Sequence, residues 1–192
     1  IDIETCLQGT EATNAAISRC RHWLQSNAVI AKKILAIELQ EGLDPDKTNG
    51  SKRIVGRILV SNREDGRLFT RKRLSALVQQ TGLDGIAVST ERAIMARFGC
   101  QRVCHQLGAL TIEQTIGSFF QTNRFLLKEL AEAVMPPDHV ARAIDLHCGV
   151  GFFSLLLASN ADWVVGVEAS SVSVRDAREN ARRNAIVNVD FL

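Results

Sequence analysis

The fold is decided by the stretch Asp145-Leu146-His147-Cys148-Gly149-Val150-Gly151. Its two glycines stand where the backbone must turn sharply between a strand and a helix. The segments around it alternate between short apolar runs and amphipathic stretches. They predict strands at 141–146, 163–168 and 187–192 and helices at 153–158 and 170–184. A β-α-β-α-β order predicts a parallel sheet with right-handed crossovers, so the second half of the chain is expected to be an α/β unit.

Glu168 ends the second predicted strand, 19 positions after Gly149. A carboxylate at this place can accept hydrogen bonds from both ribose hydroxyls of an adenosine. The pattern therefore predicts a nucleoside-cofactor site in preference to a plain structural turn. Phe152 and Phe153 crowd the start of the following helix, where a pyrophosphate would have to approach the backbone amides. This disfavours NAD and favours S-adenosylmethionine, which carries no phosphate.

The first half of the chain shows helix and strand patterns without a chemical motif. Two turn-rich stretches, 41–51 and 62–67, punctuate this half. The apolar runs predict strands at 33–39, 53–60 and 85–89, helices at 12–24 and 70–80, and a hairpin at 101–112. We expect a small α+β domain over 1–117, followed by a second domain over 118–192.

The composition is that of a globular protein. Of the 192 residues 46% are hydrophobic and 23% charged, which excludes disorder, collagen and coiled coil. No apolar run could span a bilayer and the start shows no signal peptide, so we expect a cytoplasmic protein without a membrane partner. A net charge of +2 is too mild to predict nucleic-acid binding by itself.

Cysteine usage points to reduced thiols. The chain has five cysteines, an odd number, and nothing in it signals secretion. The spacing of Cys100, Cys104 and His105 could suggest a metal, but a second ligand pair of matching spacing is missing. We therefore expect no metal site.

Several stretches together resemble the RNA uridine-5-methyltransferases that modify ribosomal and transfer RNA. They are the glycine turn with its flanks at 145–155, the strand end at 164–168, and the segment 177–184, which reads Ala-Arg-Glu-Asn-Ala-Arg-Arg-Asn. Upstream, 118–123 is similar to the phenylalanine-glutamine-asparagine signature that precedes the methyltransferase domain of that family. The resemblance is specific over about 99–192 and loose over 1–98.

The resemblance implies a central α/β domain followed by the first half of a Rossmann-like class I methyltransferase sheet. It implies S-adenosyl-L-methionine as the cofactor, ribosomal or transfer RNA as the partner, and transfer of a methyl group to carbon 5 of a uridine. The cofactor contacts that it implies are Gln121, His147, Gly149, Gly151, Phe152 and Glu168. The nucleophilic cysteine of the family lies in a later motif that does not occur here. No catalytic residue is therefore expected in this chain, which by itself is expected to be an inactive fragment of open oligomeric state.

Two of these positions depart from the family pattern. His147 stands where the family usually has Tyr or Phe, and it is either a cofactor contact or a packed histidine. Phe152 stands where the family often has Asn or Thr. Gln121 could bridge backbone groups instead of contacting the cofactor. Two other functions stay open, a methyltransferase-like module that binds cofactor or RNA without catalysis and a nucleotide-dependent oxidoreductase. In a complete methyltransferase domain these strands are central, and there we expect the apolar strand 163–167 to be buried on both faces.

Overall fold

The computed structural model describes residues 4–47, 49–120 and 123–192. By its internal contacts the chain divides into two units, Ile1–Val103 and Cys104–Leu192. This division falls before the expected boundary after residue 117, because β6 (Leu110–Thr115) packs against α7 (Ser171–Arg183). The assignment of 1–117 and 118–192 as separate domains stays a prediction.

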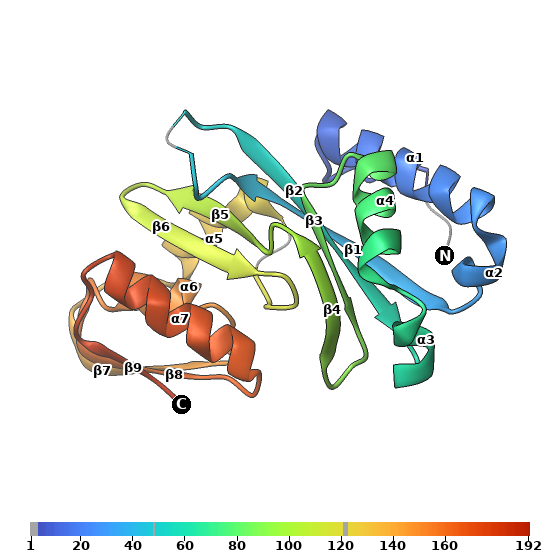
Figure 1. The fold of residues 1–192 in the computed structure, drawn as a ribbon. Helices are drawn as coiled ribbons and strands as arrows, with labels where there is room; N and C mark the ends of the chain where they lie inside the picture. The colour runs from blue at the N-terminus through green and yellow to red at the C-terminus, as the bar shows by residue number, and fades with distance from the viewer. Residues whose placement is uncertain (1–3, 48, 121–122) are drawn as a thin grey trace. The chain divides into compact units, whose positions relative to one another are not determined.

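In the first unit four neighbouring strands follow the order β4-β3-β2-β1 (Figure 1). β1 (Ile34–Leu43) and β2 (Lys52–Val60) form an antiparallel hairpin. β3 (Gly85–Ser89) runs parallel to β2, and β4 (Ile94–Gly99) runs antiparallel to β3. The predicted strands at 33–39, 53–60 and 85–89 are confirmed.

Two long helices bury the core of this unit. α1 (Glu11–Ser26) contributes Trp23 and α4 (Arg71–Thr81) contributes Leu74 to one apolar cluster with strand residues such as Ile58. All three side chains are at most 4% exposed, so the two helices cover the same side of the sheet. The short helices α2 (Ala28–Ala31) and α3 (Arg63–Arg67) were not predicted.

The second unit begins with the predicted hairpin and continues as an alternating α/β segment. β7, β8 and β9 pair in that order, and both pairs are parallel, so the predicted parallel sheet is confirmed. The elements are β5 (Arg102–Leu107, which starts at the end of the first unit), β6, η1 (Arg124–Leu126), α5 (Leu127–Val134), β7 (Val140–Leu146), α6 (Phe152–Leu157), β8 (Ala161–Val167), α7 and β9 (Val189–Phe191).

The parallel sheet has one covered and one open face among the described residues. α6 and α7 lie on the same side of it (Figure 1), where Val164 is 0% and Phe191 4% exposed. On the other side Ile144 is 69% and Trp163 42% exposed. Side chains alternate along a strand, and no described helix covers this second face. The expected burial of 163–167 on both faces concerns the complete domain and stays a prediction.

Candidate functional site

The glycine turn between β7 and α6 holds its backbone in an uncommon conformation. His147, Gly149 and Gly151 all have positive φ, at 61°, 55° and 86°. Glycine adopts this region freely, whereas a residue with a side chain pays about 1–2 kcal/mol for it. The N–H of Cys148 donates to the carbonyl of Val167 at 3.1 Å, which ties the turn to the end of β8.

Glu168 follows β8 directly, and its carboxylate bridges two backbone amides. Oε2 accepts from the N–H of Gly149 at 3.0 Å and Oε1 accepts from the N–H of Ser170 at 2.8 Å. The side chain is partly exposed, so each oxygen can accept a further hydrogen bond. The glycine turn and this acid are thus in direct contact, which the sequence did not predict.

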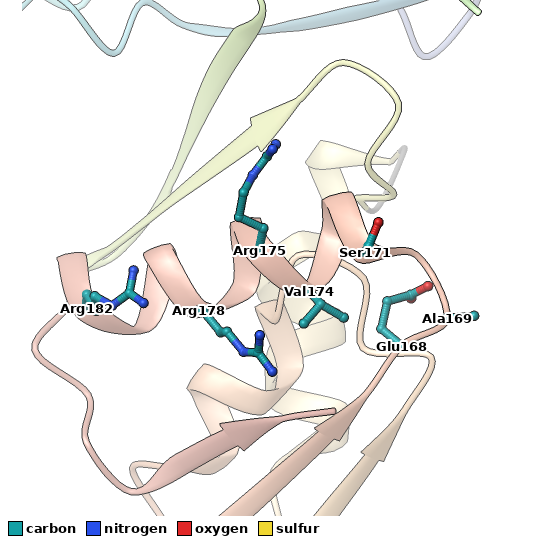
Figure 2. Close-up of a pocket in the computed structure, with 7 residues that line it drawn as sticks. All are labelled: Glu168, Ala169, Ser171, Val174, Arg175, Arg178 and Arg182. Carbon is teal, nitrogen blue, oxygen red and sulfur yellow. The ribbon is translucent and has the colours of Figure 1, made fainter. Parts of the chain in front are cut away.

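An open pocket of about 440 Å³ lies on the α7 side of this carboxylate. Figure 2 shows Glu168 at one end of it and Arg182 at the other, with Val174 between them. Arg178, in the middle of the same helix, donates to the carbonyl of Phe191 at 2.6 Å. This arginine therefore serves the packing of α7 on β9.

Close contacts with neighbouring segments, together with positive φ, explain why the turn needs its glycines. A Cβ on Gly149 would lie 2.8 Å from the carbonyl oxygen of Phe119. A Cβ on Gly151 would lie 2.9 Å from Cζ of Phe191 and 3.1 Å from Cβ of Ala177. The turn is therefore confined between the segment that follows β6 and the α7–β9 core.

A second pocket, of about 190 Å³, opens beside the turn and is largely aromatic. Phe120 stacks on His105 with 4.2 Å between ring centroids and meets Phe152 edge-on at 5.5 Å. The lining residues are Phe119, Phe120, Asp145, Leu146, His147, Cys148, Val150, Phe152 and Phe153. Rings around a carboxylate form a surface that can bind a small organic cation.

Asp145 is the carboxylate in this aromatic pocket, and it was not among the predicted contacts. Burial raises the pKa of the Asp145 carboxyl above its usual range, and hydrogen bonds from Ser154 act in the opposite direction. The hydroxyl of Ser154 donates to Oδ2 of Asp145 at 2.7 Å. A cation in the pocket would stabilise the ionised carboxylate. Its position at the end of a parallel strand was a usable signal, because ligands bind at the carboxyl ends of such strands.

Cys148 is a structural residue of the turn. The side chain is buried, and burial raises the pKa of its thiol to about 11, with the carboxylates of Asp145 and Glu168 acting in the same direction. A thiol in that state is neutral near pH 7 and is a poor nucleophile.

The predicted contacts fall on both sides of the turn. His147 is exposed and Phe152 is buried, and both line the aromatic pocket. The two glycines form the turn itself, and Glu168 lies across it. Gln121 lies outside the described residues. The role of these residues in binding a cofactor stays a prediction.

Residues 4–47, 49–120 and 123–192 contain neither a cluster of metal ligands nor a membrane-spanning helix. No group of three or more His, Cys, Asp and Glu side chains in these ranges could hold a metal ion. No helix in them is both long and apolar enough to cross a membrane.

Comparison with known proteins finds relatives for the whole chain. Residues 138–192 match the family model of a methyltransferase domain. The 23S rRNA (uracil(1939)-C(5))-methyltransferase RlmD of Pectobacterium atrosepticum is 30% identical over 177 residues, which cover 82% of this chain and 39% of that protein. The tRNA (uracil(54)-C(5))-methyltransferase of Saccharomyces cerevisiae is 25% identical over 204 residues, which cover 100% of this chain and 30% of that protein. The chain therefore spans less than half the length of these relatives.

A solved structure shows the same architecture. The tRNA (uracil-54, C5)-methyltransferase of Pyrococcus abyssi, in complex with S-adenosyl-L-homocysteine, superposes with a TM-score of 0.67 at 20% identity. The match covers 100% of this chain and 49% of that one. The structural match confirms the α/β, Rossmann-like fold, and the sequence matches confirm the resemblance to the RNA uracil-5-methyltransferases.

Proposed function

We propose that this chain, a relative of the RNA uracil-5-methyltransferases, is the cofactor-binding portion of an enzyme that methylates carbon 5 of uridine. The methyl donor is S-adenosyl-L-methionine, and the substrate is ribosomal or transfer RNA. The observation that carries the proposal is the carboxylate of Glu168, fixed by the N–H groups of Gly149 and Ser170 and still open to solvent. The activity and substrate rest on the names of the relatives.

The two pockets beside the turn suit the two ends of this cofactor. Both ribose hydroxyls donate to Glu168 in charge-assisted bonds, each contributing about 1.5–3 kcal/mol at most. The carboxylate of Asp145 accepts from the ammonium of the methionyl end, and the rings of His147 and Phe152 shield that end from water. Bound there, the cofactor supplies an electrophilic methyl group.

The chain by itself is expected to transfer no methyl group. The family pattern places its nucleophilic cysteine in a motif that these 192 residues do not contain. We propose the cytoplasm as the location. Incubation with labelled S-adenosylmethionine and unmodified RNA checks the first expectation, and label in the RNA would contradict it.

Calorimetric titration tests the cofactor assignment. S-adenosylhomocysteine should bind the chain, NAD should not, and Glu168→Ala should weaken binding by about tenfold or more. Glu132→Ala is the matched control, because Glu132 is an exposed carboxylate of α5 that pairs at 3.9 Å with Lys128 of the same helix and lines neither pocket. Binding of NAD alone would favour the oxidoreductase alternative, and binding of neither compound would count against both.

A further inference from the structure

One face of α7 pairs with the backbone of β6 through three polar side chains. Asn184 Oδ1 accepts from the N–H of Thr111 at 2.9 Å, and its Nδ2 donates to the carbonyl of Thr111 at 2.8 Å. Asn180 repeats this pattern with Glu113, at 2.8 Å and 2.9 Å. These side chains take the hydrogen-bonding places that a neighbouring strand would take.

Asp176 completes the row at the end nearest the aromatic pocket. Its carboxylate accepts from the N–H of Thr115 at 2.8 Å, from the hydroxyl of Thr115 at 2.9 Å and from the hydroxyl of Ser118 at 2.5 Å. Ser118 immediately precedes Phe119, which lines the pocket. Asp176 thus anchors one wall of the proposed cofactor site.

The spacing of the two elements makes this pairing possible. Positions 176, 180 and 184 are four residues apart on a helix, which advances about 6 Å in four residues. Positions 111, 113 and 115 are two residues apart on a strand, which advances about 6.8 Å in two residues. The near match lets three successive side chains meet three successive backbone positions.

Asn180 makes one contact that its two neighbours in the row do not make. Its Nδ2 also donates to the carbonyl of Val150 at 3.0 Å, inside the glycine turn, and its side chain is 0% exposed. Strained backbone persists only where the surroundings over-determine it. Asn180 therefore joins the turn to β6 from within the core.

We propose that Asn180 is a positioning residue, which holds the glycine turn in the shape that binds the cofactor. The inference rests on the proposed function for its ligand, and on the hydrogen bond to Val150 for its geometry. Without that bond the carbonyl of Val150 loses its buried donor. The turn then opens more often, and the N–H of Gly149 no longer holds Glu168 in place.

Two alanine variants separate positioning from plain stability. Asn180→Ala and Asn184→Ala each delete three side-chain hydrogen bonds, two of them to the backbone of β6. The third bond of Asn180 goes to the carbonyl of Val150 in the turn, whereas the third bond of Asn184 goes to the carbonyl of Asn180, at 2.7 Å, within the helix region. Both variants should be less stable than the wild type. Hydrogen exchange at 147–151 should be about tenfold faster only in Asn180→Ala, and affinity for S-adenosylhomocysteine should fall about tenfold only there.

The outcomes distinguish this inference from the proposed function. Equal effects of the two variants on turn exchange, or no effect of Asn180→Ala, would overturn the positioning role. Failure of S-adenosylhomocysteine to bind the wild type would count against the proposed function, and turn exchange would still decide the role of Asn180. If Asn180→Ala does not fold, wild-type exchange in increasing denaturant decides. The N–H groups of Gly151 and Glu113 should then become exchangeable at the same denaturant concentration. Exchange of the two groups at different denaturant concentrations would refute the proposal that Asn180 joins the turn to β6.

Discussion

Gly151→Ala should lower the free energy of unfolding by about 2–5 kcal/mol. At φ 86° an alanine pays about 1–2 kcal/mol for its backbone conformation. Its Cβ would also lie 2.9 Å from Cζ of Phe191 and 3.1 Å from Cβ of Ala177. Overpacking of this kind costs about 1–3 kcal/mol, because both neighbours are buried and have little room to move.

Two other alanine substitutions isolate these contributions. Gly108 has φ 57°, and a Cβ on it would meet no atom within 4 Å, so Gly108→Ala should show the conformational cost alone, about 1–2 kcal/mol. Gly166 lies in β8 without positive φ, and its Cβ would meet Cδ1 of Phe191 at 2.6 Å and Oγ of Ser154 at 2.8 Å. Gly166→Ala should therefore show the packing cost alone, about 1–3 kcal/mol.

Urea denaturation followed by circular dichroism measures all three variants. Phe191→Leu should offset part of the loss in the Gly151→Ala background, because the two positions touch. A Gly151→Ala variant no less stable than Gly108→Ala would refute the added packing cost, and so would a Phe191→Leu loss that simply adds to the Gly151→Ala loss.

Three further predictions follow from the titratable groups of the site. Glu168→Ala should destabilise the ligand-free chain by about 1–3 kcal/mol, because the amides of Gly149 and Ser170 lose their acceptor; unchanged urea midpoints would contradict the bridging role. Asp145→Asn should stabilise the ligand-free chain at pH 7. The folded pKa of Asp145 is raised, so its favourable contribution is present below about pH 4 and is lost as the pH rises through the folded pKa. The gain from Asp145→Asn should therefore shrink towards pH 4 in denaturation series, and a gain independent of pH would refute this cause. Cys148 should resist alkylation by iodoacetamide at pH 8, since a thiol of pKa about 11 is only about 0.1% ionised at that pH. Mass spectrometry of the labelled peptides measures the alkylation rate, and a rate as fast as that of a free thiol would contradict this prediction.

The alternating half of the fold could be predicted because its signals are local. Short apolar runs mark β7 and β8, and the glycine turn between β7 and α6 has its own sequence signature. β4 was missed because its residues 94–99 do not alternate between apolar and polar, since Ile94, Met95 and Ala96 are consecutive apolar residues. The open face of β8 was also unpredictable, since an apolar strand looks the same whether or not a helix covers it.

The site could be predicted at the level of motifs but not of contacts. The spacing of Gly149 and Glu168 predicted that both contact a cofactor, and it did not predict the hydrogen bond that joins them. Asn180 entered only as part of a resembling segment, because nothing local shows that a polar helix residue is buried against β6. Asp145 could have been identified from its place near the carboxyl end of a parallel strand, but the aromatic lining of its pocket, from 119, 120 and 152–153, could not.

An NMR titration of the nitrogen-15-labelled chain tests the central claim most directly. The reporters are the N–H groups of Gly149 and Ser170, which both donate to the carboxylate of Glu168. We predict that S-adenosylhomocysteine shifts both signals saturably, that NAD leaves them in place, and that Glu168→Ala needs about tenfold more ligand or beyond for the same saturation. Saturable shifts that spare both amides, or shifts caused by NAD and not by S-adenosylhomocysteine, would contradict the assignment of this turn as the cofactor site.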